Sequence, residues 1–204
     1  MPKHPIHPIH IIFDGRVIDE TLVIEAVKKT AGILSEDSET INYVRLSIMS
    51  IGHRQGLPLD SQTFIEGLTR EPFLKADLQG AFSRIFSEYS ALDKSGQGTG
   101  NPEVLLILGS EPDQDWVSAW KAIEPYRALI LTYWINKQPL SDYETLKLQK
   151  LLGRISLPDP DTQSPRFKIV NLFDGNESAV LEDILLKMAA RLKERVQRVG
   201  KISI

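Results

Sequence analysis

The sequence predicts an α/β protein in which a doubly wound, mostly parallel sheet of about five or six strands lies between two layers of helices. Two observations predict it. Short, almost uninterrupted apolar runs at 9–13 and 104–108 have the composition of buried parallel strands. Longer segments between such runs carry apolar residues every three or four positions, as on one face of a helix. The alternation predicts a single domain over 9–200, after a flexible N-terminal arm at 1–8.

The expected elements alternate along the chain. Strands are expected at 9–13, 41–51, 104–108, 127–135 and 167–173. Helices are expected at 19–34, 74–92, 115–124, 141–153 and 178–199. Segment 59–68 fits either a short helix or a strand with a turn, and 93–102 and 156–166 have the composition of loops. This Rossmann-like order implies right-handed crossovers and places ligands beyond the carboxyl ends of the strands.

Capping residues support several of these boundaries. Asp19 or Thr21 can cap the first helix, because a short polar side chain accepts a hydrogen bond from the first turn. Ser141 and Glu144 have the spacing of a reciprocal capping box at the start of the fourth helix. Gly153 is the expected end of that helix.

The composition excludes several classes of function. Among 204 residues, 24 are Lys or Arg and 27 are Asp or Glu, so a net charge of −3 argues against nucleic-acid binding. The chain has no cysteine, which excludes disulfides, thiolate metal sites and cysteine nucleophiles. No apolar run approaches the roughly 18 residues of a membrane span. The N-terminus lacks the apolar core of a secretory signal. These features predict a soluble cytoplasmic protein with no membrane partner.

Three segments should converge at the carboxyl edge of the sheet: 14–18, 75–78 and 108–112. Together with their strands they resemble von Willebrand factor A (vWA) domains. The resemblance is carried, in family order over nearly the whole chain, by IHIIFDG at 9–15, YVRLSIMSIGHR at 43–54, DLQGAFSRIF at 77–86 and VLLILGSEPDQDW at 104–116. The stretch YVRLSIMSIGHRQGLPLDSQTF is similar to small stand-alone bacterial members of the tellurite-resistance type. The resemblance implies a non-enzymatic adaptor that binds a protein partner.

The vWA family holds a divalent ion, usually Mg²⁺, through an Asp-x-Ser-x-Ser turn, a distant Thr and a distant Asp, since hard cations need oxygen ligands. Matched to this pattern, the chain keeps the first ligand as Asp14. The next four positions hold Arg16, Ile18, Ala76 and Gly109. A shift of one residue would put Asp77 at the threonine position. Because a guanidinium cannot coordinate a cation, the resemblance implies a degenerate site that holds neither metal nor cofactor.

The predicted partner-binding surface comprises these positions and their neighbours Gly15, Ser110 and Glu111. Two interpretations of Arg16 stay open. It pairs with Asp14 and meets a partner's acid in place of an ion, or it is an ordinary exposed loop residue. The alternative function is a small-molecule or divalent-metal-binding protein with a repurposed site at Asp14, Asp77 and Glu111. The third possible function is an enzyme that uses carboxylate chemistry.

Other residues have both a functional and a structural interpretation. His4, His7 and His10 would align in a polyproline II arm and could take up Ni²⁺, Cu²⁺ or Zn²⁺, or they are part of an arm without a role. Ser110 lacks the flanking glycines of a nucleophile elbow, and no Gly-x-Gly-x-x-Gly or Walker A motif occurs. Four large aromatic residues are expected in the core, with partner anchoring as the alternative: Trp116, Trp120, Tyr133 and Trp134.

Overall fold

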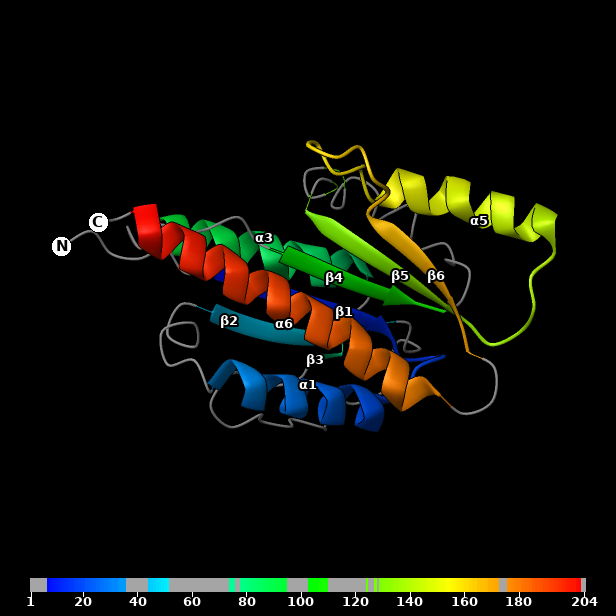
Figure 1. Ribbon diagram of the computed structural model, residues 1–204, viewed down its shortest axis with the longest axis horizontal. Helices are drawn as coiled ribbons and strands as arrows, with labels where there is room; N and C mark the ends of the chain where they lie inside the picture. The colour runs from blue at the N-terminus through cyan, green and yellow to red at the C-terminus, as the bar shows by residue number, and fades with distance from the viewer. Residues whose placement is uncertain are drawn as a thin grey trace.

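The computed structural model describes residues 7–35, 44–51, 74–75, 78–94, 103–109, 124, 127, 129–172 and 176–202. Within them the chain forms a six-stranded sheet in the order β3-β2-β1-β4-β5-β6 (Figure 1). The strands are β1 (His7–Asp14), β2 (Val44–Ile51), β3 (Leu74–Lys75), β4 (Glu103–Leu108), β5 (Ile130–Asn136) and β6 (Phe167–Asn171). The helices are α1 (Glu20–Ser35), α3 (Leu78–Lys94), α5 (Asp142–Ile155) and α6 (Glu177–Ile202).

Helices cover both faces of this sheet, as Figure 1 shows. Alternate residues of β1, β4 and β5, such as Phe13 and Ile107, pack with α1 and α6 in one core cluster. The residues between them, such as Leu106 and Trp134, point to the opposite face and pack with α3 and α5 in a second cluster. Because successive strand residues face opposite sides, burial on both faces requires continuous apolar runs. All pairings between neighbouring described strands are parallel, so the predicted α/β fold is confirmed.

Several predicted boundaries are wrong. Residues 74–75 form a short strand on Met49 and Ser50, and the helix expected from 74 begins at Leu78. An apolar residue just before a helix fits both the helical and the strand periodicity. Pairing with β2 therefore decides that residues 74–75 form a strand. Strand β5 begins at Ile130 and not at 127. Helix α5 continues through Gly153 to Ile155, because burial of the last turn outweighs the helix cost of one glycine.

The histidine-rich start of the chain differs from the expected arm. Strand β1 begins at His7, so His7 and His10 belong to the sheet. Over these two residues a strand therefore replaces the expected polyproline II arm. His10 is buried with 2% exposure. Among the described residues, no group of three or more His, Asp or Glu side chains could hold a metal ion. His4 lies outside them.

Two aromatic residues are confirmed in the core. Tyr133 and Trp134 are 7% and 6% exposed and face opposite sides of β5. Burial raises the pKa of Tyr133, which is therefore neutral at physiological pH. Trp116, Trp120 and segment 59–68 lie outside the described residues, as does the helix expected at 115–124, apart from Glu124. Within the part described, no helix is both long and apolar enough to cross a membrane.

Candidate functional site

The candidate site lies where the central strands β1 and β4 end side by side. Their register pairs Phe13 with Ile107, so Asp14 and Leu108 end the two strands at one edge of the sheet. Chain order reverses between these two strands, and ligands of doubly wound folds bind at such switch points. The structure describes five of the predicted site residues: Asp14, Gly15, Arg16, Ile18 and Gly109. Ala76, Asp77, Ser110 and Glu111 lie outside the described residues.

Asp14 and Arg16 form a two-pronged ion pair. The Arg16 Nε atom donates to Asp14 Oδ1 at 3.0 Å, and its Nη2 atom donates to Asp14 Oδ2 at 3.2 Å. The Arg16 backbone N–H also donates to Oδ1, at 3.1 Å. Asp14 is fully buried, whereas the Arg16 side chain is 33% exposed. The arginine thus neutralises a buried carboxylate, and part of its side chain reaches the surface.

The backbone of the loop after β1 is fixed by the strand end itself. The Val17 and Ile18 N–H groups both donate to the Asp14 carbonyl, at 3.2 and 3.0 Å. The Gly15 N–H donates to the Ile51 carbonyl at 3.0 Å, which ties the loop to the end of β2. The Ile18 side chain is 4% exposed and packs in the α1–α6 core cluster. Position 18 therefore faces the core, where a metal-ligating hydroxyl would have no access to the edge.

Gly109 brings the end of β4 against this loop. A Cβ atom added there would lie 2.5 Å from Val17 Cγ1 and 2.9 Å from Val17 Cβ. It would also lie 3.3 Å from the Ile135 carbonyl oxygen. Contacts this short do not occur, so the position accepts glycine and excludes a larger residue unless Val17 moves. The missing side chain is what allows Gly109, at the end of β4, to lie against Val17 in the loop after β1.

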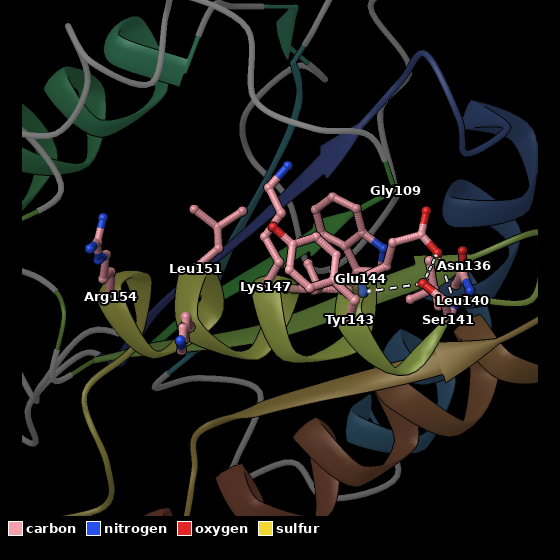
Figure 2. Close-up of a pocket in the computed structure, with 12 residues that line it drawn as sticks. Gly109, Asn136, Leu140, Ser141, Tyr143, Glu144, Lys147, Leu151 and Arg154 are labelled. Carbon is pink, nitrogen blue, oxygen red and sulfur yellow. Dashed lines mark hydrogen bonds between the residues drawn. The ribbon is translucent and has the colours of Figure 1, made fainter.

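A cavity of about 900 Å³ opens beside Gly109, between the ends of the strands and α5 (Figure 2). Trp134 and Leu148 are buried in its wall. Figure 2 shows Lys147, Leu151 and Arg154 on the same side of α5. The other described residues that line the cavity are Asn136, Leu140, Ser141, Tyr143, Glu144 and Lys150. Sequence analysis missed this site, although the cations at 147, 150 and 154 recur at the spacing of one helix face.

The polar end of the cavity is held by the cap of α5. Ser141 Oγ and the Ser141 N–H donate to Glu144 Oε2 at 2.6 and 2.8 Å, and the Glu144 N–H donates back to Ser141 Oγ at 3.3 Å. The predicted capping box is confirmed. The bond from the Ser141 side chain, followed by that from its backbone, lowers the pKa of Glu144. Glu144 is therefore anionic at neutral pH, and the positive charge of Lys147 contributes to its lowered pKa.

The sequence matches no protein-family model and no curated protein. Among solved structures, it is similar to a von Willebrand factor type A protein from Catenulispora acidiphila, with 13% identity and a TM-score of 0.44. The similarity covers 92% of this chain and 43% of that one, so the chain spans less than half of that structure.

Proposed function

We propose that the chain is a non-enzymatic, vWA-type protein-recognition module that binds its partner at the carboxyl edge of the sheet without a divalent ion. The observation that carries this proposal is the ion pair between Asp14 and Arg16 at the end of β1. The segments that resemble vWA domains and the doubly wound topology support the family assignment.

The charge at the edge supports recognition without metal. In the resemblance, Asp14 is the first metal ligand, and the ion's positive charge also attracts a carboxylate from the partner. Here the guanidinium of Arg16 supplies a positive charge at that carboxylate. Asp14 accepts from two of the guanidinium nitrogens, Nε and Nη2. The exposed third of the Arg16 side chain is where a partner's carboxylate would bind.

Two further residues support the loss of the metal. Gly109 has no room for the second aspartate unless Val17 moves. Ile18 is directed into the core and leaves no hydroxyl at the second serine position. Both features fit a site that has been rebuilt around an ion pair, since Mg²⁺ requires nearly octahedral oxygen coordination.

The test is affinity capture from a lysate of the source cell, with and without EDTA. We expect the native chain to retain its partner in EDTA, and Arg16→Ala to bind the purified partner at least roughly tenfold more weakly, since a charged hydrogen bond is lost. Arg191→Ala, an exposed position on α6, is the matched control. Release of the partner by EDTA, or undiminished binding by Arg16→Ala, contradicts the proposal.

Arg16→Ala leaves the carboxylate of Asp14 buried without the guanidinium, which itself destabilises a fold. The double variant Asp14→Asn/Arg16→Ala removes that buried charge as well. We expect it to melt closer to the native chain than Arg16→Ala does and still to lose the partner. Recovery of both stability and binding in the double variant would assign Arg16 a purely structural role.

The cavity beside α5 favours a second candidate function, the binding of a small anionic molecule. Its volume of about 900 Å³ lies within the range of ligand cavities in proteins. Trp134 offers an apolar wall, and Lys147 and Arg154 supply positive charge. Equilibrium dialysis against a panel of anionic metabolites tests this function. Saturable binding that Lys147→Ala/Arg154→Ala abolishes and Arg16→Ala preserves would favour it over the adaptor.

A further inference from the structure

The outer strand β6 directs a set of backbone groups away from the sheet. The Thr132 N–H donates to the Arg166 carbonyl at 3.0 Å, and the Leu172 N–H donates to the Asn136 carbonyl at 2.7 Å. In a parallel ladder, the N–H and C=O groups of one residue point to the same side, and the side alternates along the strand. The even-numbered residues of β6 therefore face β5.

It follows that Phe167, Ile169 and Asn171 direct their N–H and C=O groups outward. In the part of the chain that the structure describes, β6 ends the sheet and no other segment pairs with its outer side. Such an edge is a template for another strand, because each outward donor and acceptor has its complement on an extended backbone.

A groove lies along this edge. A cavity of about 620 Å³ opens between β6 and α5, and its walls include Leu140, Thr145, Gln149, Phe167 and Ile169. Phe167 and Ile169 are half-buried there, and Leu140 packs beside them against the α3–α5 core cluster. The groove is partly apolar on the α5 side, and Lys168 of β6 also contributes to its lining. Lys168 lies between Phe167 and Ile169 in the sequence, and successive side chains of a strand point to opposite faces. The Lys168 side chain is exposed and points toward the other face of β6.

We propose that this edge binds an extended segment of a partner protein, which adds to the sheet as a further strand beside β6. The segment alternates aliphatic and acidic residues. Its aliphatic side chains enter the groove between Ile169 and α5, and its acidic side chains lie on the opposite face, beside Lys168. Backbone hydrogen bonds supply the affinity in this mode of recognition, and pockets for alternate side chains supply the specificity.

Charge favours a different chain over a second copy of this one. A two-fold axis would pair β6 with itself in antiparallel orientation, as isologous contacts require. Both copies of Lys168 would then lie on the same face as near neighbours, which disfavours the pair. Lysine on an edge strand is a common safeguard against self-pairing. With an acidic partner strand, the charge of Lys168 attracts the partner's carboxylates.

The experiment uses the full chain and the peptide Glu-Val-Glu-Val-Glu-Val-Glu-NH₂ with fluorescein on its N-terminal amine, and binding is followed by fluorescence anisotropy. We expect saturable binding with one peptide per chain. Ile169→Pro removes one outward N–H and leaves the β5–β6 ladder intact, since proline is accepted where its missing donor faces outward. It should weaken binding roughly tenfold, about the value of one hydrogen bond. The matched Ile169→Ala variant keeps the N–H and should bind more tightly than Ile169→Pro.

The charge requirement is tested separately. Lys168→Glu should weaken binding of the acidic peptide and strengthen binding of a peptide in which lysine replaces every glutamate. Lys150→Glu is the matched control, because Lys150 is exposed on α5 and lines the other cavity. If Lys150→Glu loses peptide binding and Lys168→Glu keeps it, the peptide binds in that other cavity and the proposal is overturned.

Other outcomes also overturn it. Absence of saturable binding does so, as does equal binding by Ile169→Pro and Ile169→Ala. A dimer in analytical ultracentrifugation that Ile169→Pro dissociates would assign the edge to a second copy. Arg16→Ala should bind the peptide as the native chain does, since Arg16 lies at the end of β1. The outcome is therefore separable from that of the partner-capture experiment.

Discussion

Gly109 and Val17 bring the end of β4 close to the loop after β1. The sequence predicted that Gly109 replaces an aspartate of the vWA pattern. It could not predict the reason, because the contact joins residues far apart in the chain. Asp14 and Arg16 differ in this respect. They are two residues apart, so pairing could be put forward from the sequence, and the structure contains the pair.

At Gly109 we predict that Gly109→Ala lowers the free energy of unfolding by about 1–3 kcal/mol, the usual cost of overpacking. The physical reason is the approach of the new Cβ to Val17. Urea unfolding measures the change. Val17→Ala in the same chain should recover part of the loss, because it removes Cγ1, the nearer of the two Val17 atoms that clash. Gly153→Ala is the control: its Cβ would meet Phe167 Cε1 at 3.9 Å. It should stabilise α5 by up to about 1 kcal/mol.

A buried hydroxyl pair supports a second prediction for single residues. Thr132 Oγ1 and Ser156 Oγ lie 2.6 Å apart, and both residues are almost fully buried. Thr132→Val leaves the serine hydroxyl without this partner and should cost about 1–3 kcal/mol. Thr132→Val/Ser156→Ala removes both polar groups, so it should cost less than the sum of the single changes. A double-mutant cycle from urea unfolding checks this, and additive losses would contradict it.

At the scale of elements, α5 provides one wall of each cavity, so its start fixes both sites. Its capping box was predictable because both partners lie within four residues. Its end was not, because burial of Leu152 and Ile155 keeps the last turn helical beyond Gly153. Strand β3 was missed for a similar reason: two residues carry no periodicity, and their pairing with β2 is set by the tertiary fold.

We predict that Ser141→Ala destabilises the protein by about 1 kcal/mol at neutral pH, since it removes a helix cap. The lowered pKa of Glu144 adds a pH dependence. Stabilisation from a lowered carboxyl pKa is fully present above the ordinary glutamate value of about 4.3 and is lost as pH falls through the lower folded value. The gap between the two proteins should therefore narrow toward acid pH.

Urea unfolding at about pH 7 and about pH 3 measures that gap. Ser141→Thr, which keeps the hydroxyl, is the control and should follow the native chain at both pH values. A gap that stays constant or widens at the lower pH would show that Glu144 does not contribute through its charge.

At the scale of the whole molecule, the sheet order brings the candidate residues together. The sequence predicted the alternation of strands and helices, and therefore which loops share an edge. It did not predict the two cavities, because each is lined by residues from several elements that share no sequence pattern. Nor did it identify β6 as the outer strand with a half-buried groove. Strand order and the positions of helices above the sheet are products of packing between distant segments.

The proposed metal-free site predicts how the stability of the whole chain responds to divalent cations. We predict that about 10 mM Mg²⁺ or Ca²⁺, or an excess of EDTA, leaves the thermal midpoint unchanged. Binding at 100 times the dissociation constant would stabilise the fold by about 2.7 kcal/mol. For a chain of this size that corresponds to a rise of several degrees. Differential scanning calorimetry measures the midpoint, and a saturable rise with either cation would contradict the proposed function.

The packing of α1 against α6 over one face of the sheet also affects how the chain folds during its synthesis on the ribosome. Synthesis proceeds from the N-terminus, at about 5–20 residues per second. Until residues 177–202 emerge, α1 stands without its neighbour, and apolar side chains of β4 and β5 on that face stay in water. A nascent chain halted before residue 177 therefore exposes a ready binding surface for a chaperone.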